Sequence, residues 1–123
     1  MSRQRFPINT DQPRATLYTF TIDGSEVSST ATGSDGLNGR GKNLCTILKS
    51  TARLTITWLV AFAERPIVNF SMGGAQTNAI VEPVTSTATE LVVDVVKATD
   101  NSAQADADLE VIVVGYSTTS FVS

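Results

Sequence analysis

The sequence contains no histidine and only one cysteine, Cys45, among its 123 residues. Without histidine, the chain lacks the usual general base of serine and cysteine nucleophiles and the commonest metal ligand. A single cysteine excludes an internal disulfide bond and a zinc site built from several cysteines. Cys45 lies in an apolar run with no imidazole beside it, so we expect a small buried side chain rather than a nucleophile.

Long hydrophobic runs and a strong charge of one sign are also absent. The charge-free apolar stretch at the centre of the chain covers residues 54–63, about half of the roughly twenty residues that a membrane helix needs. No apolar run follows residues 1–7, so we expect no secretory signal. The net charge is only −3. This balance is typical of neither a nucleic-acid binder nor a membrane-surface protein, and we expect no direct nucleic-acid or membrane partner.

The few charges are distributed unevenly along the chain. Residues 1–65 carry eight of the nine basic residues against five acidic ones, whereas residues 66–123 carry one basic residue against seven acidic ones. Two interpretations stay open at this point. Either the asymmetry is chance and disappears on folding, or the chain is an assembling protein whose basic end meets an acidic partner.

The basic end begins with an unusual segment. Residues 1–14 contain Arg3, Arg5 and Arg14 together with two prolines and little periodicity, a pattern that predicts an extended arm rather than core. The remaining residues 15–123 have the size of one domain with a single core.

Valine, isoleucine and threonine account for 37 of the 123 residues, a composition that favours strands. Apolar residues alternate with period two in several segments, which we predict to be strands. These are residues 16–22, 53–62, 67–72, 79–84, 90–97 and 109–116. Pro83 places its segment at a sheet edge or a strand end. The last segment is apolar on both faces, which predicts a position inside a two-layer structure.

Two regions admit more than one interpretation. Residues 44–53 fit helical spacing and alternation equally well, and we favour a strand that turns at residues 49–52, because no other helix competes in the chain. Residues 26–32 are rich in serine and threonine and form either a solvent-facing strand or a loop. Six to eight short strands predict an all-β fold, a β-sandwich or jelly roll of antiparallel strands with an extended N-terminal arm. Trp58 is then expected in the core.

A glycine-rich segment at residues 33–43 resembles a phosphate-binding loop. Two glycines and Lys42 have the required spacing, but the next position holds Asn43 where a serine or threonine hydroxyl should coordinate magnesium. The preceding residues are polar, whereas such a loop follows a buried strand. We therefore favour a flexible excursion between strands, in which Arg40 and Lys42 contact a partner.

Acidic residues are the remaining candidates for chemistry. Asp106, Asp108 and Glu110 alternate, and Asp100 lies nearby, so four carboxylates could collect a calcium ion. The glycine and ligand spacing of a calcium loop are missing, and a solvated rim is the commoner explanation, so cation binding stays open and no cofactor is predicted. The neighbours Lys49 and Ser50 are a weak basis for a Ser–Lys nucleophile. We expect the protein not to be an enzyme.

More than half of the chain resembles a β-sandwich module of tailed-phage virion proteins, which include capsid decoration (cement) proteins and tail-fibre domains. The likeness lies in the hairpin of residues 45–58, in residues 62–68 (an aromatic, then Pro66 and a β-branched pair), and in the closing strands and polar loop of residues 91–116. The pattern is hydrophobic alternation punctuated by proline and glycine, without a catalytic signature. The hairpin departs from it because residues 50–52 contain no glycine.

This resemblance implies a virion structural protein on the phage head surface, made in the host cytoplasm, that stabilises the head by bridging capsid subunits. Its partner would be the major capsid protein. A dimer or trimer is expected because exposed sheet edges gain from being paired or covered. The alternative is a tail-fibre or baseplate module that recognises host glycans through residues 33–43 and 99–108. The residues expected to contact a partner are Arg3, Arg5, Phe6, Arg14, Arg40 and Lys42.

Overall fold

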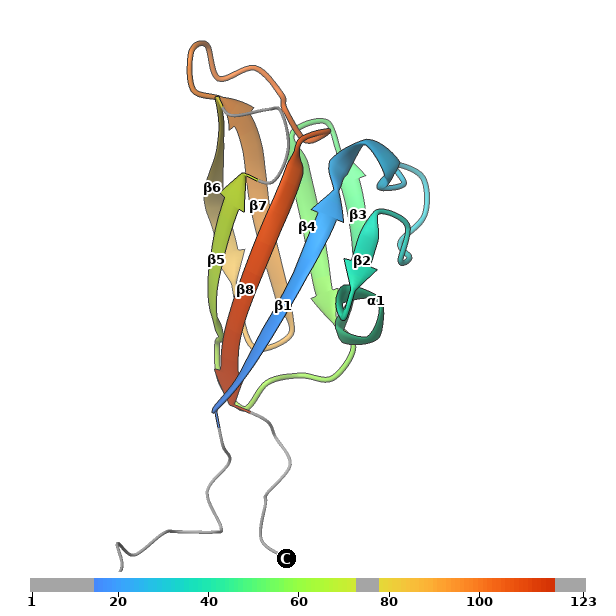
Figure 1. Ribbon diagram of the computed structural model, residues 1–123, viewed down its shortest axis with the longest axis vertical. Helices are drawn as coiled ribbons and strands as arrows, with labels where there is room; N and C mark the ends of the chain where they lie inside the picture. The colour runs from blue at the N-terminus through green and yellow to red at the C-terminus, as the bar shows by residue number, and fades with distance from the viewer. Residues whose placement is uncertain (1–14, 73–77, 117–123) are drawn as a thin grey trace, which may run out of the picture.

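The computed structural model describes residues 15–72 and 78–116 and has an all-β sandwich fold, as predicted. Two antiparallel sheets of four strands pack face to face (Figure 1). Sheet A has the order β2-β1-β8-β5, and sheet B has the order β3-β4-β7-β6. The predicted arm, residues 1–14, lies outside the described residues. The elements are β1 (Ala15–Asp23), the 3₁₀ turn η1 (Gly24–Glu26), β2 (Leu37–Gly39), α1 (Gly41–Leu44), β3 (Cys45–Ser50), β4 (Arg53–Trp58), β5 (Ile67–Met72), β6 (Ala79–Ser86), β7 (Glu90–Lys97) and β8 (Asp108–Tyr116).

The strand connections bring the first strand, β1, beside the last strand, β8, in the same sheet. β1 pairs with β8 over its whole length, from Ala15 opposite Tyr116 to Asp23 opposite Asp108, and β4 pairs with β7 in the other sheet. The chain crosses between the sheets after β2, β4, β5 and β7. Eight strands in two antiparallel sheets thus form a β-sandwich in which the first and last strands lie side by side.

The core lies between the two sheets, and β7 and β8 contribute much of it. β7 directs Leu91, Val93 and Val95 inward from sheet B, and β8 directs alternate residues inward from sheet A. The inward residues of β8 are Leu109, Val111 and Val113, and all six side chains are buried. β6 lies at the edge of sheet B, as Pro83 predicted, and its pairing with β7 shifts between Pro83 and Thr85.

The predicted strand over residues 53–62 is too long. β4 ends at Trp58 because the chain opposite it is no longer a strand: Leu59 N–H still donates to Leu44 O at 2.9 Å, but Leu44 belongs to the helical turn α1. Phe62 N–H donates to Ala88 O at 2.9 Å, so this stretch forms the connection across the end of the sandwich. Trp58 is buried in the core as predicted, and its ring centroid lies 5.3 Å from that of Phe62 in an edge-to-face arrangement.

Residues 45–50 form strand β3, which confirms the strand interpretation of this region. Ser50 pairs with Arg53, so Thr51 and Ala52 alone make the turn into β4. Thr51 has φ 57°, in the left-handed region, where a β-branched residue is strained. The turn therefore forms without the glycine that the phage modules led us to expect, at a cost in strain.

The glycine-rich segment is more structured than predicted. Residues 33–43 contain β2, which pairs with β1 at the edge of sheet A, and most of the single helical turn α1. Gly36 has φ 87°, and a Cβ at Gly41 would lie 2.7 Å from the Phe20 ring, so both positions require glycine. The predicted excursion is wrong for residues 37–39, because β1 offers a free edge that they pair with. Residues 27–32 form a loop.

One side of the sandwich is closed by backbone and side-chain bonds. Gly33 and Ile47 exchange two backbone hydrogen bonds of 3.2 and 2.8 Å, which covers the outer edge of β3. Lys49 Nζ donates to Gly24 O and to Asp106 Oδ1, both at 2.7 Å, and thereby ties sheet B to the turn that follows β1. On the opposite side, no other described strand pairs with the outer edge of β5 or of β6.

Replacement of Thr51 by glycine is expected to stabilise the protein. The left-handed conformation costs an L-residue roughly 1–2 kcal/mol, and glycine removes this strain. Part of the stabilisation is lost again because glycine gives the unfolded chain more conformational freedom. We expect T51G to raise the free energy of unfolding by about 0.5–1 kcal/mol, measured by urea denaturation. The control A52G, at a neighbour without positive φ, should lower it. A decrease in T51G would contradict the strain at this turn.

Candidate protein-binding surface

The outer face of sheet A carries large apolar side chains in water. Leu17 on β1 is 61% exposed and Ile67 on β5 is 65% exposed. Ile112 and Tyr116 on β8 are also exposed, and Val114 between them is half-buried. In antiparallel sheets with one solvated face, outward positions are normally polar. β8 lies in the two-layer structure that its apolar sequence predicted and is central in its sheet, but no described residue covers the outward side chains Ile112 and Tyr116.

These side chains form one continuous surface, because the strand register brings them together. Leu17 and Ile67 lie opposite Val114 from its two sides, so the three span β1, β8 and β5 in a row. Ile112 and Tyr116 lie two residues away on either side of Val114, on the same face of β8. We call Leu17, Ile67, Ile112, Val114 and Tyr116 the apolar sheet patch. Contiguous exposed apolar surface of this kind marks protein–protein contacts.

The other end of the same face is acidic. Asp23 and Asp108 lie directly opposite each other, and Glu110 follows two residues further along β8. Hydrogen bonds from Ser25, whose Oγ lies 2.6 Å from Asp23 Oδ1, lower the pKa of Asp23 below its ordinary value. Asp23 thus stays ionised beside Asp108. The face divides into an apolar half at the start of β1 and an acidic half at its end.

Two of the predicted basic contact residues, Arg40 and Lys42, are not part of this surface. Arg40 and Lys42 are exposed at the beginning of α1, which contacts β2, at the opposite edge of sheet A from β5. Arg3, Arg5, Phe6 and Arg14 lie outside the described residues. The segment that resembled a phosphate-binding loop contains β2, so its backbone pairs with β1 instead of forming a cradle.

Two of the four carboxylates considered for a cation site have other partners. Asp106 accepts from Lys49, and Asp100 accepts from the backbone and side chain of Ser102 at 3.0 and 2.7 Å. Those bonds lower the pKa of Asp100. Within residues 15–72 and 78–116, no three acidic, histidine or cysteine side chains come together to hold a metal ion.

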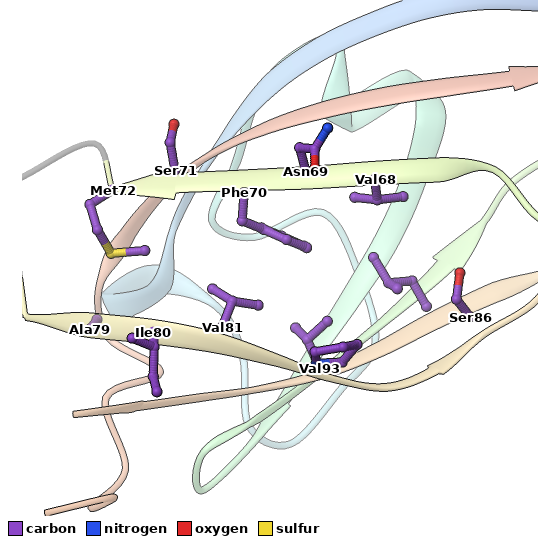
Figure 2. Close-up of a pocket in the computed structure, with 12 residues that line it drawn as sticks. Val68, Asn69, Phe70, Ser71, Met72, Ala79, Ile80, Val81, Ser86 and Val93 are labelled. Carbon is purple, nitrogen blue, oxygen red and sulfur yellow. The ribbon is translucent and has the colours of Figure 1, made fainter. Parts of the chain in front are cut away.

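A groove opens between the edge strands β5 and β6, with a volume of about 540 Å³. Figure 2 shows Val68, Phe70 and Met72 pointing from β5 toward β6, while Asn69 and Ser71 point away. Val81 of β6 points into the same space. The sequence analysis missed this groove. The apolar alternation in residues 67–72 and 79–84 was the sequence feature that could have indicated this groove. Only the order of the strands in the two sheets shows that both segments lie at sheet edges.

Of the three side chains considered for nucleophilic chemistry, Cys45 and Lys49 are engaged within the fold. Cys45 is buried, as predicted, with Sγ 3.6 Å from Gly41 O. Lys49 Nζ is engaged by Gly24 and Asp106, while the neighbouring Ser50 is exposed at the β3–β4 turn.

The chain matches no known protein family, no curated protein and no solved structure. Of the helices in the described part of the chain, none has the length and apolar character needed to cross a membrane.

We expect the Cys45 thiol to be inert in the folded protein. Burial raises its pKa to about 12, so almost no thiolate forms at pH 8. Reaction with a disulfide reagent such as Ellman's should be roughly a thousandfold slower than in the chain unfolded by guanidinium. Native and unfolded rates within tenfold of each other would mean that Cys45 is accessible.

The ion pair between β4 and β7 predicts a loss of stability in acid. Arg53 Nε donates to Asp94 Oδ1 at 2.9 Å and Nη2 to Oδ2 at 3.2 Å, and these bonds lower the pKa of Asp94. A carboxyl whose pKa is lower in the folded chain stabilises it above the unfolded pKa, and this contribution disappears as pH falls through the folded pKa. The urea concentration at the unfolding midpoint should therefore decrease when the pH is lowered below about 4.

Two variants isolate this contribution. D94N and R53Q should each lower the urea midpoint at pH 7 and reduce its fall between pH 5 and pH 2, and the double variant should add little to either. Acid profiles of both variants parallel to that of the natural protein would show that the pair does not couple to folding.

Proposed function

We propose that this protein is a virion structural protein that decorates a phage head and stabilises it by bridging capsid subunits. The observation that carries the proposal is the apolar sheet patch, an uncovered apolar surface on a domain whose core is already complete. The resemblance to tailed-phage sandwich modules supports the same class of protein. The major capsid protein is the proposed partner.

The bridging mechanism follows from the position of the patch. It lies on the rigid face of a sheet, so docking requires little reordering of the chain. Burying one large apolar side chain contributes about 1.5–3 kcal/mol. A subunit that contacts two capsid proteins at once adds this free energy to the cost of separating them, and the shell then resists internal pressure.

The basic residues have a second role in this proposal. Arg3, Arg5 and Arg14 in the arm, with Arg40 and Lys42 at α1, would steer the protein toward an acidic capsid surface and set its orientation. A small homo-oligomer, a dimer or trimer, fits the edge of β6, which no other described strand pairs with.

A glycan-binding tail or baseplate module is less well supported. Residues 33–43 and 99–108 contain no aromatic side chain on which a sugar ring could stack. The second of these loops is also folded against β7: Lys97 N–H donates to Ser102 O and Gln104 N–H to Val95 O, both at 2.8 Å. Its exposed surface is therefore polar and short.

Mass spectrometry of particles from cells infected with a phage that encodes this chain tests the proposal. Head decoration predicts a copy number per particle comparable with that of the major capsid protein. A few copies per particle, found with the tail fraction, would support the glycan-binding alternative, and absence from particles would overturn both.

A variant experiment then tests the patch. L17S/I67T should bind heads that lack the protein at least about tenfold more weakly, because two apolar contacts are lost. The matched control V84T changes an exposed apolar side chain on sheet B and should bind normally. Thermal denaturation should give similar melting temperatures for all three proteins. Undiminished binding of L17S/I67T would exclude the patch as the capsid contact.

A further inference from the structure

We infer that residues 3–8 add a fifth strand to sheet A of their own chain: they pair antiparallel with the free edge of β5 and place Phe6 and Ile8 in the groove between β5 and β6. This inference concerns the fold of the arm and does not rest on the proposed function.

The groove has the properties of a site for an added strand. Its lining side chains Val68, Phe70 and Val81 are half-buried and apolar, so they gain from a cover. β5 presents unpaired backbone groups along its outer edge within the part of the chain that the structure describes. A peptide strand satisfies both at once, since its backbone pairs with the edge and its alternate side chains fill the groove.

The direction of the chain fits this placement. Ala15 lies opposite Tyr116, and Ile67 lies opposite Val114 on the same strand β8, so β1 and β5 begin at the same end of the sheet (Figure 1). A strand antiparallel to β5 finishes at that end, where β1 starts. Residues 117–123 leave β8 at the same end and could only run parallel to β5, so they fit this edge less well.

The length of the arm also fits. Six residues of strand extend about 20 Å, which matches the six residues of β5. Neighbouring strands lie about 4.8 Å apart, so the step from the edge of β5 past β8 to β1 is on the order of 15 Å. The six residues 9–14 reach up to about 20 Å. The arm can therefore cover β5 and return to β1.

The arm sequence has the required pattern. Phe6 and Ile8 share one face of a strand, and Arg3 and Arg5 share the other. Pro7 between them lacks an N–H and is therefore tolerated only at a sheet edge, which is where the added strand would lie.

The charges on the outer face also agree. With Phe6 opposite Phe70, Arg5 lies opposite Ser71, whose Oγ is 3.5 Å from Glu110 Oε1. β5 itself carries no charge, and β6 carries only Glu82. The arginines would thus lie at the acidic half of sheet A, exposed to a partner, while Phe6 contacts its own chain.

Hydrogen exchange on the full chain tests the inference. In F6S/I8S, the backbone amides of β5 should exchange at least about tenfold faster than in the natural protein, because the covering strand is lost. The matched control R3Q/R5Q changes two outward residues and should leave these amides protected. The amides of β3 are the internal reference, because residues 28–33 cover the outer edge of that strand. Equal exchange of β5 in the natural protein and F6S/I8S would overturn the inference.

Cross-linking identifies the chain that supplies the strand. With Cys45 buried, R5C/S71C presents two accessible thiols on the same face of the sheet, and a short bismaleimide should join them within one chain. The control R5C/T57C places the second thiol on the outer face of sheet B and should react much less. A product only between two chains would overturn the same-chain assignment, and equal yields from both variants would overturn the placement at β5.

Discussion

The packing of β7 against β8 is the contact on which the rest of the sandwich depends. Each strand is central in its sheet and directs three aliphatic side chains into the shared interior. The remaining strands join by pairing outward from these two: β4 and β6 flank β7, and β1 and β5 flank β8. Because burial of these aliphatic groups is the main driving force for folding, a charge on the inner face of either strand would separate the two sheets.

The two sides of this core are closed to different extents, and both candidate surfaces include the more open side. On the β3 side, the loop around Gly33 covers the sheet edge, and Lys49 ties the layers together through Gly24 and Asp106. On the β5 side, both sheets end in strands whose outer edges lack a partner in the described structure. β5 contributes to both candidate surfaces: Ile67 points outward into the apolar sheet patch and Phe70 points inward to the groove.

Several polar groups that first suggested chemistry act in the described structure as parts of the scaffold. Lys49 joins the two sheets through Gly24 and Asp106, and Asp100 holds its own turn through Ser102. Cys45 is a core side chain whose raised pKa follows from burial alone. Among the described residues, the distinctive surface features are the apolar sheet patch and the strand edges that no other described strand pairs with.

The sequence by itself determined the strands and their alternation. Period-two patterns located β1, β5, β7 and β8 to within a residue, because alternate side chains of a strand must face opposite sides. Pro83 also marked a sheet edge from local chemistry alone, because proline has no N–H to donate to a neighbouring strand. Alternation cannot tell where pairing stops: the pattern continues to Phe62, but β4 ends at Trp58, because the chain opposite it belongs to α1 from Leu44 backward. Only the tertiary structure decided which alternating face stays in water and which edges lie together, since both depend on strand order, and strand order depends on contacts between residues far apart in the chain.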